Sequence, residues 1–425
     1  MNSEHRRPLA TIAVVAVGIL ILGSLLSACQ SSAPSSQSAG ASKQGGETVK
    51  LGMATDLSGS AALLGVAGVN GVTLAVEDLN AAGGVLGKKI ELIVRNTEGR
   101  PEAGTREVRD LIQREKVAAL MGPVSSAVGL AESAVAKENK VPIFLHTSNT
   151  ERLTVDLGHP YVFSVVPNTG IEGRAQAIDM AKLPYKTYYI IGPDYEFGHL
   201  QANAFKEKMK ELRPDVQFVG EQWPKLGETN YQSFITAILA AKPEAVYSNL
   251  WGGDLVGFTK QAKGYGFFEK TFFTALYDVE VLSTLGSDTP NGVRGFSRAP
   301  FYAIDNPKIG PWVQKYRNRF GIYPSDWPIM AYDAVNLWAA GVKKANTFEA
   351  DAVVKALEGY KFDSLRGPLN IRAADHQGDV ASYMGEVGST DKYPFPIYKS
   401  VRAVAGDKAW MPEGDIAKLR ANPRQ

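Results

Sequence analysis

Residues 49–90 of the chain read VKLGMATDLSGSAALLGVAGVNGVTLAVEDLNAAGGVLGKKI. The short apolar run at the start predicts a strand over Val49–Met53. Apolar residues then recur at helical spacing from Ala67 to Asn80, and the Ala-Ala-Gly-Gly that follows suits a helix C-terminus. Lys89–Asn96 predicts the next strand. A strand, a helix and a strand in this order predict a βαβ unit.

The same alternation continues toward the C-terminus. It pauses at an extended run, Tyr161–Pro167, and then restarts. Strict alternation predicts parallel sheets with helices on both faces, and two α/β units of similar size predict two lobes. A third segment adds helices and then short strands. The expected helices are 102–115, 126–139, 172–180, 199–211, 231–240, 255–265, 311–320, 331–345 and 348–357, and the expected strands are 117–121, 141–145, 187–192, 216–221, 245–250, 271–276, 367–371 and 382–387.

Polar loops follow two strands of the first unit. Ligands in open α/β sheets sit outside the carboxyl ends of the strands, so a cleft between two facing lobes is the expected site. Ser126 opens a helix after the strand 117–121, where hydroxyl and backbone N–H groups favour an anion. The polar stretch 146–150 follows the strand 141–145. Plain helix capping by these residues is the alternative.

Two loops of the second unit carry an aromatic and an acidic side chain. Trp251 ends a strand and precedes Gly252 and Gly253, so its ring can approach a ligand while the backbone turns tightly. A tryptophan packed in the core is the alternative. Asp278 follows the strand 271–276 and suits a cationic group, or else a helix N-cap.

The N-terminus carries an export signal. Arg6 and Arg7 precede an apolar run that ends in Leu26-Ser27-Ala28-Cys29, and Cys29 is the only cysteine of the chain. The tetrad looks like a bacterial lipobox, in which Cys29 becomes the lipidated first residue of the mature protein. Residues 1–28 are then a signal peptide, and 29–47, rich in Ser, Gly and Ala, a flexible tether. An uncleaved transmembrane anchor is the alternative, since the run is about long enough to span a bilayer.

Composition and motifs argue against several functions. Lys plus Arg 46 against Asp plus Glu 44 leaves a net charge of +2 without a basic stripe, so nucleic-acid binding is not expected. The five histidines lack metal-ligand spacing, so neither a metal nor a cofactor is expected. No GxSxG elbow is present, and the glycine-rich stretch 83–89 precedes a strand, where a phosphate-binding loop would follow one. An enzyme is therefore not expected.

Three segments carry a family resemblance: Leu51–Gly59, Asn70-Gly71 and Asp78–Ile90. Together they resemble the opening of the leucine/isoleucine/valine-binding proteins, which are type I periplasmic-binding fold components of ABC importers. The resemblance implies an α/β fold of two doubly wound, Rossmann-like lobes joined by a three-crossing hinge. The crossings are expected near Val165–Pro167, Val293–Arg298 and Tyr360–Leu369. Lobe 1 would comprise 48–166 and 298–362, and lobe 2 would comprise 167–297 and 363–425.

The resemblance also implies the ligand contacts. Asn149 stands where the family usually has Thr or Ser, and Leu64 where amino-acid binders often have an aromatic residue. These departures weigh against a branched-chain amino acid as the ligand more than they weigh against small-molecule import as the function. Glu280 is an alternative to Asp278 as the acidic residue that faces the cleft. The implied contacts are Ser126, Thr147 through its backbone, Ser148 and Asn149 for a carboxylate, Trp251 as the closing aromatic, Phe197 as a wall, and Asp278 for an ammonium group.

The sequence thus predicts an exported, lipid-anchored solute-binding protein. It would capture a small polar ligand, such as an amino acid or an amide, by hinge closure and present it to an ABC permease in the membrane. Two alternatives remain: a ligand-sensing subunit of a membrane receptor, and an α/β hydrolase or amidase.

Overall fold

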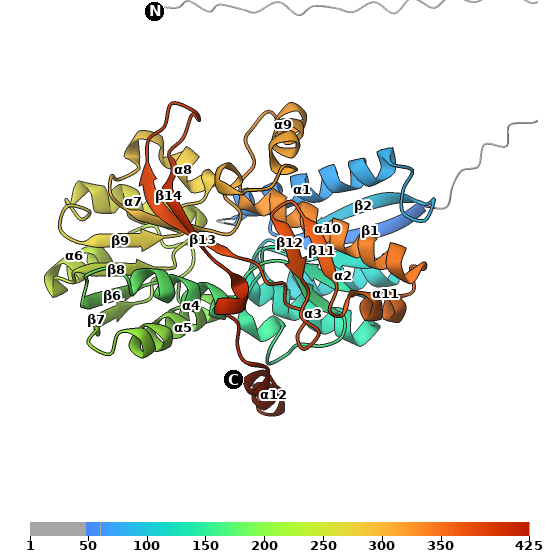
Figure 1. Cartoon of the computed structure of the whole chain (residues 1–425), viewed down its shortest axis with the longest axis horizontal. Coiled ribbons are helices and arrows are strands. Elements are labelled where there is room, and N and C mark those ends of the chain that lie inside the picture. The colour runs from blue at the N-terminus through green and yellow to red at the C-terminus, as the bar shows by residue number, and fades with distance from the viewer. Residues whose placement is uncertain (1–47, 60, 425) are drawn as a thin grey trace, which may run out of the picture. The chain divides into compact units, whose positions relative to one another are not determined.

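Two sheets organise the chain, and helices cover both faces of each (Figure 1). The computed structural model describes residues 48–59 and 61–424. The expected signal peptide, Cys29 and the tether lie outside these ranges. The predicted fold class, two doubly wound α/β lobes joined by a hinge, is confirmed.

The first sheet has the strand order β2-β1-β3-β4-β5, and every neighbouring pair is parallel. On one face Leu51 and Phe144 share a core with Trp338 of α10 and Leu79 of α1. Helices α2 and α3 cover the other face. The bounds are β1 Thr48–Thr55, α1 Ala62–Ala81, β2 Lys89–Asn96, α2 Pro101–Gln113, β3 Ala119–Met121, α3 Ser126–Asn139, β4 Ile143–Leu145, η1 Glu151–Leu153, β5 Val162–Ser164, α10 Asp326–Ala345 and α11 Ala350–Leu357.

The second sheet has the order β14-β13-β10-β9-β8-β6-β7. Its strands from β6 to β10 run parallel, and β13 and β14 add an antiparallel edge. Phe205 of α5 packs with Tyr247 on one face, and Phe258 of α7 packs with Phe273 on the other. The bounds are α4 Thr169–Met180, β6 Thr187–Ile191, α5 Glu196–Leu212, β7 Gln217–Gln222, α6 Gln232–Ala241, β8 Ala245–Ser248, α7 Gly252–Gly264, β9 Phe272–Ala275, α8 Val279–Leu285, η2 Gly286–Asp288, β10 Arg294–Ser297, β13 Ser382–Gly388 and β14 Ile397–Val404.

The chain passes between the sheets where β5 leads to α4, and again just after β10, close to the first two expected crossings. The third crossing lies later than the expected 360–369. Those residues form the hairpin of β11 (Lys361–Ser364) and β12 (Gly367–Asn370), and Phe362 and Leu369 pack in the core of the first lobe. The chain enters the second sheet only at Ser382.

The last segment returns to the first lobe, although the resemblance assigned it to lobe 2. Helix α12 (Glu413–Ala421) follows η4 (Gly406–Lys408). Arg420 donates to the carbonyl oxygens of Thr154 and Val155, both at 3.1 Å. Arg424 binds the carboxylate of Asp156. These bonds hold the C-terminus on the first lobe, just after η1. Helix α12 is the dark red helix in Figure 1.

Helix α10 begins five residues before the expected start and so reaches the hinge. Ser325 is its N-cap residue, and Asp326 and Pro328 occupy its first turn, which is a common pattern for a helix start. Between β10 and α10 lie η3 (Phe301–Ala303) and α9 (Ile309–Phe320), and α9 lies against α1. Because α10 starts early, it brings Trp327 to the space between the lobes.

Candidate functional site

A small cavity lies between the two lobes, at the carboxyl ends of the parallel strands. Both lobes and the hinge contribute walls, and most of the lining side chains are almost fully buried. The lobes therefore stand in a closed arrangement around it. The lining residues are Leu64, Val124, Ser126, Thr147, Asn149, Tyr195, Phe197, Trp251, Leu276, Arg298 and Trp327.

Ser126 presents a hydroxyl group to this cavity. The preceding loop is fixed by Asp56, whose carboxylate accepts the backbone N–H groups of Val124 and Ser125, each at 2.9 Å. Ser125, not Ser126, is the N-cap residue of α3. The Ser126 oxygen accepts the N–H of Thr150 at 3.2 Å, which leaves its own O–H to donate to a ligand.

The loop after β4 supplies the next wall. Thr147 and Asn149 line the cavity, whereas Ser148 turns its side chain toward α3, where a Cβ on Gly129 would lie 2.1 Å from the Ser148 oxygen. Within the described residues the backbone N–H of Thr147 has no hydrogen-bond partner. Ser126 and Thr147 thus offer two neighbouring donors. Burial lowers the pKa of His146 to about 4, so this neighbouring imidazole is neutral at pH 7.

The side chain of Asn149 is hydrogen-bonded to residues of the hinge. Its amide nitrogen donates to the carbonyl oxygen of Pro167 at 2.8 Å and to Glu172 Oε2 at 2.9 Å. Glu172 also accepts Arg298 Nε at 2.5 Å, and Arg298 Nη1 donates to the carbonyl oxygen of Thr147 at 3.3 Å. Burial raises the pKa of Glu172, and the facing guanidinium opposes that shift. This network ties the Thr147–Asn149 loop to two hinge crossings.

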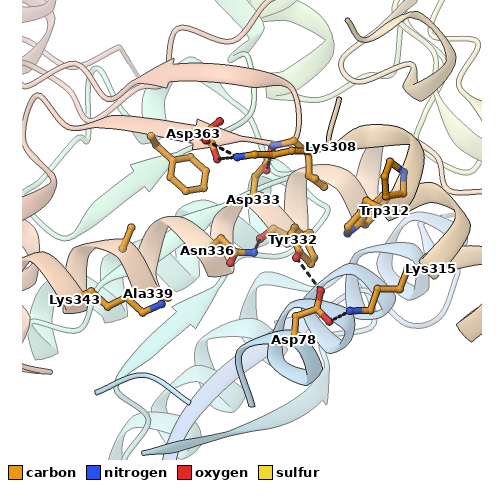
Figure 2. Close-up of a pocket in the computed structure, with 14 residues that line it drawn as sticks. Asp78, Lys308, Trp312, Lys315, Tyr332, Asp333, Asn336, Ala339, Lys343 and Asp363 are labelled. Carbon is orange, nitrogen blue, oxygen red and sulfur yellow. Dashed lines mark hydrogen bonds and ion pairs between the residues drawn. The ribbon is translucent and has the colours of Figure 1, made fainter. Parts of the chain in front are cut away.

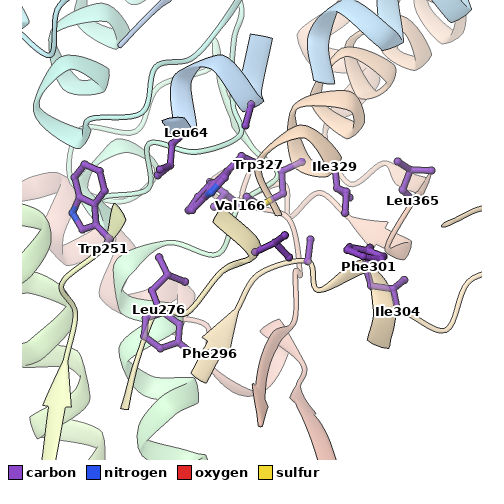
Figure 3. Close-up of a cluster of buried hydrophobic side chains, with 14 of the residues drawn as sticks. Leu64, Val166, Trp251, Leu276, Phe296, Phe301, Ile304, Trp327, Ile329 and Leu365 are labelled. Carbon is purple, nitrogen blue, oxygen red and sulfur yellow. The ribbon is translucent and has the colours of Figure 1, made fainter. Parts of the chain in front are cut away.

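The rest of the cavity is apolar and largely aromatic. Phe197 stacks on Tyr195 with ring centroids 5.8 Å apart. Trp251 lies directly before α7, where Gly252 adopts φ +51°, a left-handed conformation that favours glycine. Trp327 enters from α10, and its ring lies 4.8 Å from the Arg298 guanidinium carbon. Figure 3 shows Leu64, Trp251, Leu276 and Trp327 converging from different elements on this region.

Asp278 does not line the cavity. Its Oδ1 accepts the backbone N–H of Val281 at 2.8 Å and so caps α8. Burial raises its pKa to about 7. The structure thus brings together Ser126, Thr147, Asn149, Phe197 and Trp251, and leaves Ser148 and Asp278 behind the wall.

Sequence reasoning did not single out Tyr195, Arg298 or Trp327 as ligand contacts. Tyr195 lies in the loop after a predicted strand, so its position was a usable signal. The Ser325-Asp326-Trp327-Pro328 stretch is a helix-start pattern that points to Trp327. For Arg298 no local signal exists, because its neighbours come from distant segments.

A second, wider hollow lies on the outside of the first lobe (Figure 2). Its walls come from α1, α9, α10 and the β11–β12 hairpin. Lys308 pairs with Asp363, and Lys315 pairs with Asp78, so these charges are already matched. No element of the second lobe contributes to this hollow, so hinge closure would not cover it.

Over 48–59 and 61–424, no cluster of three or more His, Cys, Asp or Glu side chains has a geometry suited to a metal ion. Helix α1 is the one described helix long and apolar enough to cross a membrane, and 56% of its most apolar stretch is buried inside the protein. It is a core helix of the first lobe.

Comparison with known proteins identifies the family. The model of the periplasmic binding protein family matches residues 48–392. The chain belongs to this family. The resemblance to its leucine/isoleucine/valine-binding members, expected from the sequence, is also confirmed.

Three relatives illustrate the similarity. Leu/Ile/Val-binding protein homolog 4 of Brucella abortus is 24% identical over 368 residues, covering 82% of this chain and 86% of the relative. A solute-binding protein of an ABC transporter from R. palustris, solved in complex with benzoate, superposes with a TM-score of 0.75 at 23% identity. The match covers 84% of this chain and 97% of that protein. A leucine-binding protein from Thermotoga maritima superposes with a TM-score of 0.74 at 22% identity. The match covers 83% of this chain and 98% of that protein.

Proposed function

We propose that this protein is an exported, lipid-anchored solute-binding component of an ABC importer, and that it closes over a small carboxylate with an aromatic or apolar body. Its family consists of binding proteins of such transporters. The protein makes and breaks no bond of its ligand. Cys29 carries the lipid, and residues 29–47 link it to the folded part.

The lining of the interlobe cavity carries this proposal. Ser126 and Thr147 supply hydrogen-bond donors for a carboxylate, while Tyr195, Phe197, Trp251 and Trp327 supply four aromatic rings. Among the described residues that line the cavity, none is Asp or Glu. The ammonium group of an α-amino acid would have no carboxylate partner there, and burying an unpaired charge is costly. A benzoate-like acid has no such group, and the R. palustris relative binds benzoate.

Closure agrees with this ligand class. The cavity has walls from both lobes, so a ligand that touches both shifts the population toward the closed state. We assign β1–β5, α10, α11 and the β11–β12 hairpin to lobe 1, and β6–β10 with β13–β14 to lobe 2.

A direct contact between the lobes marks the closed arrangement. Glu196, at the start of α5, accepts the hydroxyl of Thr150, and its other oxygen lies 3.3 Å from Arg152 Nη1. Thr150 and Arg152 belong to lobe 1, and Glu196 belongs to lobe 2. This contact spans the cleft beside the ligand cavity and would break on opening.

The test is a thermal-shift and calorimetric screen of the purified protein with benzoate, 4-hydroxybenzoate, leucine and benzyl alcohol. Benzoate at 100 times its Kd is expected to add about 2.7 kcal/mol of stability. Benzyl alcohol, which lacks the carboxylate, is expected to bind far more weakly. Binding of leucine without benzoate would overturn the ligand class, and failure of all four would contradict the proposed function.

A further inference from the structure

Four buried polar atoms without a hydrogen-bond partner lie where α8 of the second lobe meets the start of α10. Two are carboxylate oxygens on the α8 side, Asp278 Oδ2 and Glu280 Oε2. The other two are the hydroxyl of Ser325 and the indole N–H of Trp327, on the α10 side. Asp278 lies close to the Trp327 indole and Glu280 close to the Ser325 hydroxyl, although neither pair forms a hydrogen bond of regular geometry. Each acceptor on one lobe thus faces a donor on the other.

Negative charge is in excess at this contact. Asp326, beside Ser325, accepts the Ser297 hydroxyl at 2.7 Å and the Arg298 backbone N–H at 2.6 Å. The Arg298 guanidinium is already paired with Glu172. The charged and titratable groups that face Asp278 and Glu280 are Asp326, Arg298, Arg317, Tyr302, Tyr316 and Tyr398.

Such a contact favours the protonated carboxyl. Burial raises the pKa of Asp278 to about 7. Burial, followed by the neighbouring charge of Asp278, raises the pKa of Glu280 well above its usual range. A protonated carboxyl also relieves the repulsion among Asp278, Glu280 and Asp326.

We propose that Asp278 and Glu280 are positioning residues that form a proton-dependent latch between the lobes: on closure they take up a proton, meet Ser325 and Trp327, and hold Trp327 in the wall of the ligand cavity. This inference rests on the proposed function, since it assumes that the lobes open and close around a ligand. It involves no covalent step, and the proton comes from solvent.

The sign of the pH effect follows from linkage. Opening exposes the carboxyls to water and returns them toward their ordinary pKa of about 4. The closed state then binds more protons than the open state between about pH 4 and the raised pKa values. Affinity therefore falls as pH rises through this window, by up to about tenfold per pH unit for each proton, and levels off above it.

Calorimetry of benzoate binding at pH 5.5, 6.5 and 7.5 tests the latch. The wild-type Kd is expected to rise by up to about tenfold per pH unit, with proton uptake on binding seen as a buffer-dependent heat. The double variant Asp278→Asn/Glu280→Gln is expected to show neither the pH dependence of Kd nor the proton uptake. The side-chain oxygen of the substituted asparagine can still accept the Val281 N–H, so the cap of α8 is kept.

The matched control is Glu132→Gln. Glu132 is also fully buried without partners for its carboxylate oxygens, but it lies in α3, inside one lobe. Its environment does not change on closure, so this variant is expected to keep the pH slope of the wild-type protein. If the Glu132→Gln variant lost the pH dependence of Kd, the assignment of the proton uptake to Asp278 and Glu280 would be overturned.

Two outcomes separate the latch from the proposed function. Benzoate binding with a pH-independent Kd and no proton uptake would overturn the latch and leave the function standing. If benzoate and leucine both fail to bind, small-angle scattering of the free protein still tests the latch. The wild-type protein is then expected to be more compact at pH 5.5 than at 8.5, and the double variant equal at both. Equal dimensions in the wild-type protein would overturn the latch.

Discussion

Arg298 and Glu172 form a buried ion pair at the hinge, with Nε 2.5 Å from Oε1 and Nη2 3.2 Å from Oε2. The exposed fractions of the two residues are 3% and 1%. Glu172 lies in the first turn of α4, just past the first crossing, and Arg298 lies at the second. The pair therefore links two hinge segments, and the two residues are 126 positions apart in the sequence.

Removing one member of this pair is expected to be costly. Glu172→Gln leaves the guanidinium buried without its counter-charge, which typically costs about 3–5 kcal/mol. Urea unfolding measures the loss. The double variant Arg298→Met/Glu172→Leu is expected to lose less than the sum of the single losses, because no unpaired charge remains. Additive losses would show that the two side chains act independently.

Ser126→Ala is expected to weaken benzoate binding by about 1–3 kcal/mol, because a buried carboxylate loses one hydrogen-bond donor. The matched control is Ser125→Ala. Ser125 neighbours Ser126 in the sequence and is also buried, but it does not line the cavity and makes no side-chain capping bond. Calorimetry on both variants is the measurement, and equal effects would mean that Ser126 serves the helix and not the ligand.

Elements set by local sequence could be predicted closely. The strand Lys89–Asn96 and the helix Ser126–Asn139 coincide with β2 and α3 to the residue. Both begin at strong local signals, such as the glycines before β2 and the serines at the start of α3. Ser126, Thr147 and Trp251 could be found in the same way, since the carboxyl end of a parallel strand is where a ligand meets the sheet.

The residues that could not be predicted depend on distant segments. Arg298 gains its role only when β10 returns to α4, and α8, seven residues long, is too short for a periodic pattern. The edge strand β14 and α12 were not expected either, and the return of α12 to the first lobe rests on Arg420 and Arg424. Whether Asp278 faces the cleft or caps a helix depends on the register of the loop after β9, and a shift of about one residue exchanges the two positions.

Glu132→Gln is expected to flatten the pH dependence of stability. Burial raises the pKa of Glu132 well above its usual range, and the charge of Asp56 adds to this. In the unfolded chain this carboxyl ionises near pH 4.3. Its raised native pKa therefore makes the wild-type protein lose up to about 1.4 kcal/mol per pH unit as the pH rises above that value. Urea unfolding from pH 5 to 8 checks this, and equal slopes in both proteins would contradict it.

Cys29→Ser is expected to release the protein from the membrane without changing benzoate affinity. Cys29 is the only cysteine, and 18 residues separate it from the first described residue, Thr48. Membrane fractionation with mass spectrometry of the N-terminus is the measurement. A serine variant that still pellets with the membrane would favour the uncleaved anchor.

Trp251→Ala is expected to act mainly on the rate of ligand release. Trp251 comes from lobe 2, lies 6% exposed in the cavity wall, and meets a ligand held on lobe 1 only after closure. Its removal opens the wall of the closed state and leaves the encounter with the open state unchanged. Differences in affinity within one site usually reside in the dissociation rate. A loss of about 2 kcal/mol, typical of a buried aromatic contact, corresponds to a roughly thirtyfold faster release of benzoate in stopped-flow experiments. Trp223→Ala is the control, because Trp223 lies against His199 with ring centroids 4.0 Å apart and does not line the cavity. If Trp251→Ala slows association and leaves release unchanged, Trp251 guides ligand entry and does not close over the ligand.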